Sequence, residues 1–241
     1  MARVRNDEEY ARKRDAILDV AEGLVFSKGY ERLAISDLMT ETGISKGALY
    51  YYFGSKREVL QGLLERRLAR WDARLGPVCD GHGSPTTRLR EFLRTLAGAK
   101  SEDRGFLVDV LRSVYAEENL IVYASTRTSL ADRLLPRLTA IIADGCADGS
   151  FTVAAPEATA RVVLSLLQEC ADRIGRLLIA VADGEARPAD VETQATAYVE
   201  ALHRTLGAAP GTLDFIGTDD LRRWVRAACD QQAPVDRAEV S

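Results

Sequence analysis

Two glycines, Gly43 and Gly54, enclose a short segment whose residue types suit contact with a nucleic acid. The residues that could make such contacts are Ser45, Lys46, Gly47, Tyr50 and Tyr51. A lysine at the start of a helix can reach base edges in a major groove, a tyrosine hydroxyl can donate to a phosphate, and a glycine lets the backbone approach closely. The alternative is a solvated helix with a tyrosine-rich packing face, and the segment by itself fits both interpretations.

The residues around this segment predict a helix-turn-helix. A short helix over residues 37–42 is followed by Gly43, which can take the positive φ that closes a turn. Ser45 stands at the N-cap of a second helix over residues 46–52. A helix this short is not stable alone, so packing must hold it, through Ala48, Leu49 and Phe53. The residues left outside would be Lys46, Gly47, Tyr50, Tyr51 and Tyr52.

A third helix boundary opens a long helix. Ser55 and Glu58 form a capping box, with Ser at the N-cap and Glu three positions later. Apolar residues recur at helical spacing as far as Leu75, and Gly76-Pro77 is expected to stop the helix. At about 1.5 Å per residue, residues 56–75 span roughly 30 Å. This helix would connect the N-terminal residues to a second domain.

The first helix is predicted over residues 7–28 and is closed by Gly29. Its inner face is expected to carry the apolar residues that recur at helical spacing: Ile17, Val20, Ala21, Leu24 and Val25. Its inner face would cover the helix-turn-helix. Basic residues precede or open this helix, namely Arg3, Arg5, Arg12, Lys13 and Arg14. They could form an arm that reaches DNA or a solvated charged end, since Asp7, Glu8 and Glu9 lie among them.

The sequence Gly-Ile-Ser-Lys-Gly-Ala-Leu-Tyr-Tyr-Tyr-Phe at residues 43–53, followed by Ser-Lys at residues 55–56, closely resembles the signature of the TetR family of bacterial transcriptional regulators. The resemblance is specific over residues 16–64 and only architectural beyond them. It implies that residues 45–51 belong to the recognition helix and that Tyr50 and Lys56 contact phosphates.

Two positions depart from the family pattern. Ala34 stands where the family usually has a threonine that caps the first short helix, which indicates a weaker cap or one phosphate contact fewer. A pair of tyrosines fills positions that are often occupied by histidine, so the base preference stays open.

The composition is that of an ordinary globular protein, with 241 residues of which 46% are apolar. A net charge of −4 and a pI near 5.4 argue against a nonspecific nucleic-acid coat. Residues 1–74 hold 14 basic and 12 acidic side chains, whereas the remainder holds 18 and 24. This uneven distribution suits an N-terminal part that meets phosphates and a remainder that does not.

Cys79, Cys146, Cys170 and Cys229 are scattered singly, without the clustered ligands that a structural zinc site needs. We therefore expect no metal and no cofactor, and reduced thiols of which one could sense redox state. The N-terminus has no apolar signal region, and no apolar run of about eighteen residues occurs. These features predict a cytoplasmic protein without a membrane segment.

Only helical patterns appear in the rest of the chain, so the predicted fold is all-α. The helices are expected over residues 88–99, 106–115, 119–147, 157–182, 191–206 and 219–230, with Asn119 as a cap, a bend at Pro136 and Pro156 at a first helical position. The predicted organisation is a helix-turn-helix DNA-binding domain (residues 1–55), a connecting helix (56–75), a helical effector-binding and dimerisation domain (76–231) and a disordered tail (232–241).

The helices over residues 157–182 and 191–206 carry broad apolar stripes joined by the short loop at Asp183-Gly184. They would form an antiparallel hairpin, and pairing it with a symmetry mate would build a four-helix bundle. The alternative is that both stripes fill the core of a monomer. We favour a homodimer, because helix-turn-helix proteins normally bind two half-sites about 34 Å apart and because TetR-like proteins dimerise through this pair.

The resemblance also implies an effector pocket in the second domain, where a bound small molecule tilts the connecting helix and releases a palindromic operator. Polar side chains that interrupt apolar faces are the candidates for ligand contacts: Tyr115, Glu118, Tyr123, Arg127 and Gln168. Each of them could equally be a satisfied core or interface residue, and Glu118 with Arg127 could form an ion pair.

The sequence shows no nucleophile elbow, phosphate-binding glycine loop or metal-ligand spacing, so we do not expect an enzyme. The prediction is a DNA-binding repressor that a small-molecule effector releases from its operator. The alternative is a helical sensor or protein-interaction module that does not bind DNA.

Overall fold

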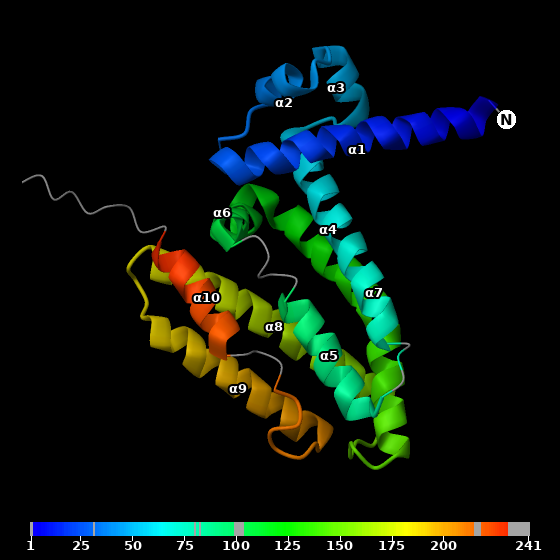
Figure 1. The fold of residues 1–241 in the computed structure, drawn as a ribbon, viewed down its shortest axis with the longest axis vertical. Coiled ribbons are helices and arrows are strands. Elements are labelled where there is room, and N and C mark those ends of the chain that lie inside the picture. Colours follow the sequence, from blue (N-terminus) through cyan, green and yellow to red (C-terminus); the bar gives the residue numbers. More distant parts are fainter. Residues whose placement is uncertain are drawn as a thin grey trace, which may run out of the picture. The chain divides into compact units, whose positions relative to one another are not determined.

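The computed structural model describes residues 2–30, 32–79, 81, 83–98, 104–214 and 218–230. Within these residues the regular structure is entirely helical, which confirms the all-α prediction (Figure 1). The elements are α1 (Ala2–Lys28), α2 (Ile35–Thr42), α3 (Lys46–Tyr52), α4 (Lys56–Cys79), α5 (Pro85–Gly98), α6 (Arg104–Tyr115), the short 3-10 helix η1 (Glu117–Asn119), α7 (Leu120–Ala147), α8 (Pro156–Ala182), α9 (Pro188–Leu206) and α10 (Thr218–Cys229). His82 and residues 232–241 lie outside the described part.

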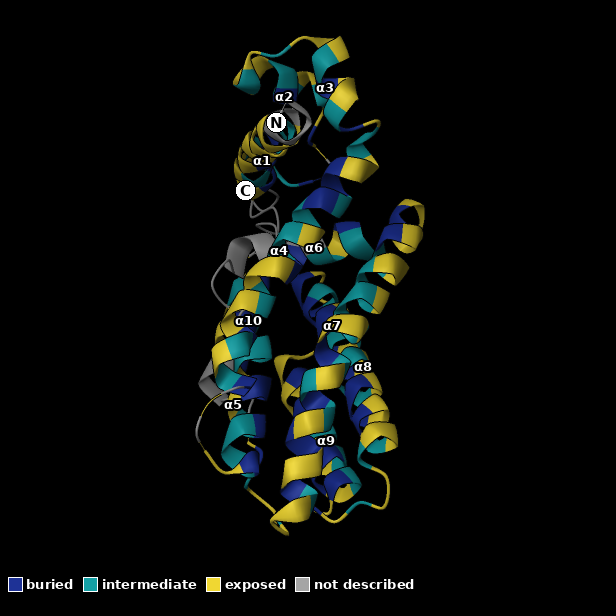
Figure 2. Ribbon diagram, turned by 90° about the vertical axis from the view of Figure 1, so that its right-hand side faces the viewer, coloured by how far each residue is buried: buried dark blue, intermediate teal, exposed yellow. Residues whose placement is uncertain are grey.

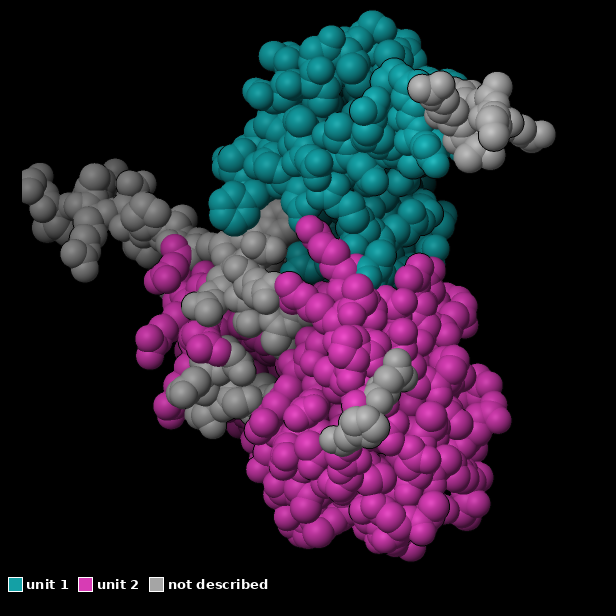
Figure 3. Space-filling model, turned by 45° about the vertical axis from the view of Figure 1, so that its right-hand side comes forward, with its two compact units in different colours: residues 1–69, 112–126 teal, residues 70–111, 127–241 magenta. Residues whose placement is uncertain are grey.

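The chain divides into two compact units (Figure 3). Unit 1 comprises residues 1–69 and 112–126, and unit 2 comprises residues 70–111 and 127–241. Unit 1 thus contains the helix-turn-helix, most of α4 and the segment around η1. The division differs from the boundaries expected from the sequence, because residues 112–126 group with the N-terminal helices.

The core of unit 1 is formed by the inner face of α1 and the helices that pack on it. Its side chains are at most 4% exposed and include Ile17, Leu18, Ala21 and Val25 of α1, Leu38 of α2, Leu49 and Phe53 at α3, and Val59, Leu60 and Leu68 of α4. The predicted inner face of α1 is therefore confirmed at Ile17, Ala21 and Val25. Val20 and Leu24 were also assigned to it but are only half-buried.

Within unit 1, Arg66 of α4 forms hydrogen bonds and ion pairs with α1. Its guanidinium donates to Glu22 at 2.5 Å and to the backbone carbonyl of Asp15 at 3.2 Å, and it lies 2.7 Å from the carboxylate of Asp19. Burial on its own would lower the pKa of Arg66, but the two carboxylates outweigh burial and raise it. Arg66 thus joins the middle of α4 to α1 by several charge-assisted contacts.

Gly62 lets α4 approach α1 closely. A Cβ at this position would meet Leu18 at 3.1 Å and Phe53 at 3.2 Å, and both of these side chains are held in the core. We expect Gly62→Ala to destabilise the protein by about 1 kcal/mol, because overpacking outweighs the gain in helix propensity. Gly23→Ala is the matched control: nothing lies within 4 Å of a Cβ there, so the substitution should stabilise by about 0.5–1 kcal/mol. Urea unfolding of both variants measures the difference, and equal shifts would contradict the close contact.

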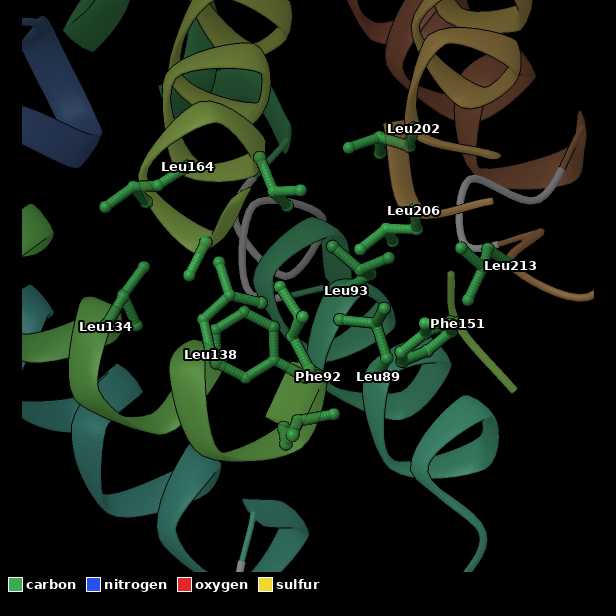
Figure 4. Packing of buried hydrophobic residues seen from close by; sticks show 14 of the residues in the cluster. Leu89, Phe92, Leu93, Leu134, Leu138, Phe151, Leu164, Leu202, Leu206 and Leu213 are labelled. Carbon is green, nitrogen blue, oxygen red and sulfur yellow. The ribbon is translucent and has the colours of Figure 1, made fainter. Parts of the chain in front are cut away.

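The main core of unit 2 joins α5, α7, α8 and α9 (Figure 4). The labelled side chains come from all four helices and from the segments that follow α7 and α9: Leu89, Phe92, Leu93, Leu134, Leu138, Phe151, Leu164, Leu202, Leu206 and Leu213. Phe151 follows the turn at Gly149, where φ is 81°, and its backbone N–H donates to the carbonyl of Gly145. This turn returns the chain against α7 and places an aromatic ring in the core.

The helices α8 and α9 form the predicted antiparallel hairpin, but their apolar stripes are buried within one protomer. Cys170, Ile174, Leu177, Leu178 and Val181 of α8 and Val191 and Ala195 of α9 pack with Leu221, Trp224 and Ala228 of α10. The outward faces of α8 and α9 are mostly polar and exposed (Figure 2). The stripes therefore do not themselves provide a dimer interface, because α10 and the rest of the core already cover them.

The expected end of α4 at Gly76-Pro77 is wrong, since the helix continues to Cys79. A proline disfavours the helical conformation of the preceding residue through contacts that include that residue's Cβ, and Gly76 has none. The helix ends soon after Pro77, so the missing N–H disturbs little of it. Arg88 then donates to the carbonyl of Cys79 from Nη2 at 2.6 Å and from Nε at 3.1 Å.

Several helices also start earlier than predicted, α5 and α9 by three residues each and α6 by two. The first helix begins at Ala2 rather than at residue 7. Asn119, expected to cap the helix that follows it, is 2% exposed and donates its side-chain amide to the carbonyl of Ser113 at 2.8 Å. It thereby ties the end of α6 to the start of α7, and an amide buried in this way needs such a partner. Pro156 does occupy the start of α8 as predicted.

Candidate nucleic-acid interface

The turn between α2 and α3 has the predicted geometry. Gly43 has a φ of 69°, and its N–H donates to the carbonyl of Met39 at 2.9 Å. The hydroxyl of Ser45 accepts the N–H of Ala48 at 3.2 Å, which caps α3. The helix-turn-helix is therefore confirmed, with α3 over the seven residues from Lys46 to Tyr52.

The two sides of α3 differ sharply in exposure. Leu49 is fully buried and Phe53 is 1% exposed, while the guanidinium of Arg14 lies 4.9 Å from the centroid of the Phe53 ring. On the opposite side Tyr51 is 66% exposed and Tyr50 is 44% exposed. Ser45, Lys46 and Gly47 are exposed as well. The packing thus holds α3 by one side and presents the predicted contact residues on the other.

Lys46 lies beside Tyr50 on the outer side of α3. The ammonium nitrogen is 6.0 Å from the centroid of the Tyr50 ring, at the outer limit of a cation–π contact. Such a loose contact leaves Lys46 able to extend toward a partner. An aromatic hydroxyl and an ammonium group are therefore available close together on one exposed surface.

Tyr52 was expected on the outer side but is half-buried, because it packs against Tyr10 of α1. The centroid of the Tyr10 ring lies 4.9 Å from that of Tyr52 and 5.5 Å from that of Tyr51. Tyr51 and Tyr52 are themselves 5.2 Å apart. Tyr10 stands seven residues before Ile17, so helical spacing extends the inner face of α1 to it, but sequence reasoning missed this contact.

Lys56, the other predicted phosphate contact, begins α4 and is held by Tyr30. Its ammonium nitrogen lies 4.4 Å from the centroid of the Tyr30 ring, and the Tyr30 hydroxyl donates to the backbone carbonyl of Lys56 at 3.2 Å. Tyr30 is itself 4% exposed. A buried ring on the loop after α1 therefore positions a half-exposed lysine, and sequence reasoning missed this partner.

Ala34 occupies the N-cap position before α2 and supplies no side-chain cap, as expected from its missing hydroxyl. The carboxylate of Asp37 compensates in part, because it accepts the N–H of Ala34 at 2.7 Å and forms an ion pair with Lys28. Lys28, and then the Ala34 N–H, lower the pKa of Asp37. The backbone N–H of Ala34 thereby gains an acceptor inside the helix. A threonine cap would work the other way round, because its side chain would accept an N–H from the first turn of the helix.

The predicted capping residues at the start of α4 are present. The Ser55 hydroxyl accepts the N–H of Glu58 at 3.2 Å. The Glu58 carboxylate accepts the N–H of Gly54 at 2.8 Å, so it secures the loop between α3 and α4. The turn after the proposed recognition helix is thus fixed at both of its ends.

The candidate effector contacts fall into two groups that belong to different units. In unit 1, the rings of Tyr115 and Tyr123 meet edge to face at 5.5 Å, while Glu118 is exposed on η1. In unit 2, Arg127 donates to Gln168 at 3.3 Å and forms an ion pair with Asp172 of α8. Gln168 donates in return to the carbonyl of Arg127 at 3.1 Å. Asp172 is the partner that sequence reasoning did not find for Arg127.

The described residues contain no group of three or more histidine, cysteine or acidic side chains that could hold a metal ion. All four cysteines are unbridged: Cys79 and Cys170 are buried, and Cys146 and Cys229 are half-buried. In the part of the chain that was searched, no helix is long and apolar enough to cross a membrane.

Comparison with known proteins agrees with this geometry. Residues 17–63 match the model of the bacterial regulatory proteins of the tetR family. An uncharacterised HTH-type transcriptional regulator of Lactococcus lactis is 33% identical over 81 residues, which are 33% of this chain and 41% of that protein. The HTH-type transcriptional repressor KstR2 of Mycobacterium tuberculosis is 30% identical over 78 residues, which are 32% of this chain and 39% of that protein. The chain thus aligns with less than half the length of these relatives.

Comparison of the fold shows that the similarity continues beyond the aligned N-terminal residues. A TetR-family transcriptional regulator from Pectobacterium atrosepticum superposes with a TM-score of 0.64 at 22% identity, covering 83% of this chain and 96% of that one. At this identity the match shows the fold alone. The signature and the family model agree that residues 17–63 form a domain of the tetR-family type, and the fold of the chain is that of TetR-family structures.

Proposed function

We propose that this protein is a DNA-binding transcriptional regulator, most simply a repressor that a small-molecule effector releases from its operator. The observation that carries the proposal is the asymmetry of α3, in which one side is locked into the core while Lys46, Tyr50 and Tyr51 are exposed on the other. A surface helix held in this way can enter a major groove without rearrangement. Repression is supported by the likeness of the head to that of a named repressor.

Each residue of the proposed interface has a distinct role. Lys46, near the start of α3, reads a base edge, and Tyr51 extends the contact along the same side. Tyr50 and Lys56 contact phosphates and fix the register of the helix on the duplex. Ser45 caps α3 and stands at its phosphate-facing end, while Gly47 lets the backbone approach the DNA.

We further propose that the protein acts as a homodimer on a palindromic operator. A single seven-residue helix offers little contact area, and two copies about 34 Å apart double it. The outward faces of α8 and α9 are the proposed contact, with Val162, which is 51% exposed, among their residues. Sedimentation analysis tests the dimer directly, and a monomer at micromolar concentration would overturn it.

Two separate sets of residues are the proposed effector contacts: Tyr115, Glu118 and Tyr123 in unit 1, and Arg127 with Gln168 in unit 2. Support comes from the polar network of Arg127 with Gln168 and Asp172, which interrupts otherwise apolar faces of α7 and α8. Thermal unfolding in the presence of a panel of small aromatic and acidic compounds tests effector binding, because a ligand specific for the folded state raises the melting temperature.

Selection of bound duplexes from a random pool is the decisive experiment for DNA binding. The proposed function predicts that the purified protein enriches one palindromic sequence at low ionic strength without any added compound. The competing interpretation, a helical sensor or protein-interaction module, predicts no enrichment. A pool that stays random would therefore reject the proposal.

Lys46→Ala should weaken binding to the selected duplex by about 1–3 kcal/mol, because one base contact is lost in each half-site. The selected sequence should at the same time relax at one position of each half-site. Affinity for an unrelated duplex of equal length is the control and should change far less. Equal losses on both duplexes would remove Lys46 from the base-reading role.

A further inference from the structure

The exposed end of α3 is contacted by an aromatic residue that lies far from it in sequence. Tyr10, on the third turn of α1, is half-buried, and its ring meets Tyr52 at 4.9 Å with the planes tilted by 35°. It meets Tyr51 edge to face at 5.5 Å and 83°. Tyr51 and Tyr52 complete the set at 5.2 Å and 81°. Three rings therefore contact one another pairwise, all at separations favourable for aromatic pairs.

This set, Tyr10 with Tyr51 and Tyr52, is here termed the tyrosine triad. It lies on the solvent side of the head rather than in the core, since Tyr51 is 66% exposed. A side chain so exposed would ordinarily sample several rotamers, and a partner that binds it must restrict that freedom. Contact with two other rings restricts Tyr51 before any partner arrives.

The triad also bears on how α3 is held. The buried anchors of α3, Leu49 and Phe53, fix its inner side. Its final residues, Tyr51 and Tyr52, immediately precede Phe53, where the backbone is extended rather than helical. Contact with Tyr10 of α1 therefore restrains the end of α3 on its outer side, which Leu49 and Phe53 do not contact.

A cation of α1 that interacts with Tyr52, Lys13, is paired with an acidic neighbour. Lys13 lies 2.9 Å from Glu9, and both side chains are more than half exposed. That ion pair, with a smaller contribution from Tyr52, raises the pKa of Lys13. The contribution of the triad to DNA binding should accordingly come from geometry rather than from charge, and it should depend little on salt.

We propose that Tyr10 is a positioning residue for DNA recognition, whose ring holds Tyr51 and Tyr52 in their binding orientation at the end of α3. This inference rests on the proposed function, because it assigns a role within the same DNA-binding surface. Tyr10 acts through its ring, so a phenylalanine can replace it. The residue couples α1 to the recognition helix outside the buried core.

The first test needs no DNA. With ring-labelled tyrosine, Tyr10→Leu should shift the ring resonances of Tyr51 and Tyr52 and leave that of Tyr198, in unit 2, unchanged. Tyr10→Phe should leave Tyr51 close to its original position. The matched control is Ala11→Leu, which changes an exposed neighbour on the same turn of α1. Unmoved Tyr51 and Tyr52 resonances in Tyr10→Leu would overturn the proposal.

The second test measures affinity for the duplex selected from the random pool. Tyr10→Leu should weaken binding by about three- to tenfold, the range expected for aromatic pair contacts, and Tyr10→Phe by less than about twofold. The slope of log affinity against log salt should not change. In a background that already carries Tyr51→Ala and Tyr52→Ala, Tyr10→Leu should have almost no further effect.

Comparing the effect of Tyr10→Leu in the two backgrounds separates positioning from a general loss of structure. A merely structural role would lower affinity by the same factor in both backgrounds, and that outcome rejects the proposal. If the wild-type protein selects no duplex, the proposed function fails, and the recognition role of Tyr10 fails with it. The resonance shifts distinguish that case from failure of the aromatic contact itself.

Discussion

Raising the monovalent salt concentration from about 50 mM to about 200 mM should weaken binding to the selected duplex by about 10³- to 10⁵-fold, if the dimer makes about six to ten phosphate contacts. Each neutralised phosphate releases condensed counterions, so log affinity falls against log salt with a slope of about −0.9 per contact. The net charge of −4 does not oppose this steep dependence, because the acidic excess lies beyond residue 74. Fluorescence anisotropy at several salt concentrations gives the slope.

Lys56→Ala identifies one of the contacts behind that slope. Removing one phosphate contact from each protomer should flatten the slope by about two units per dimer and weaken binding to all duplexes alike. Tyr30 holds the Lys56 ammonium group at 4.4 Å from its ring, so the lysine reaches the DNA from a restricted position. Arg94→Ala is the control, since it removes an exposed cation on α5 of unit 2, away from the proposed dimer contact. A variant slope equal to that of the wild type would exclude Lys56 as a phosphate contact.

Gly145→Ala should destabilise the protein by about 2 kcal/mol or more, the second large effect that we expect. A Cβ at Gly145 would lie 2.1 Å from Cδ2 and 2.5 Å from Cε2 of Phe151, a ring that is itself 2% exposed. The added methyl group must therefore displace a core side chain or shift α7, which outweighs the gain in helix propensity of about 0.5–1 kcal/mol. Urea unfolding monitored by circular dichroism measures the change.

The control for Gly145→Ala is the same substitution in a Phe151→Leu background. Leucine is smaller and more adaptable than phenylalanine, so most of the effect of the added methyl group should disappear. The coupling between the two positions would then identify the ring contact as its source. An undiminished effect in the double variant would place the cause elsewhere in α7.

The helix-turn-helix could be predicted from the sequence because its signals are local. Gly43 supplies the positive φ of the turn, Ser45 caps the helix that follows it, and Ser55 and Glu58 secure the next start; all of these act within a few residues. The failure at Gly76-Pro77 was also local, and it came from applying the proline rule without the exception that a preceding glycine allows.

The contacts of Lys56, Arg127 and Tyr52 could not be predicted in the same way. Their partners, Tyr30, Asp172 and Tyr10, lie 26, 45 and more than forty residues away along the chain, and no periodicity connects them. The apolar stripes of α8 and α9 were recognised correctly as helical faces. These faces are covered in part by α10. No local sequence pattern specifies where α10 packs.

The sequence by itself determined the class of fold, the position of the helix-turn-helix and the side of α3 that turns outward, because capping, turn formation and helical periodicity depend on neighbouring residues. Only the tertiary structure decided that Tyr10 contacts the recognition helix, that Tyr30 holds Lys56 and that α10 covers the α8–α9 hairpin. These pairings follow from how whole helices pack, and packing selects among many partners of similar hydrophobicity that the sequence alone does not distinguish.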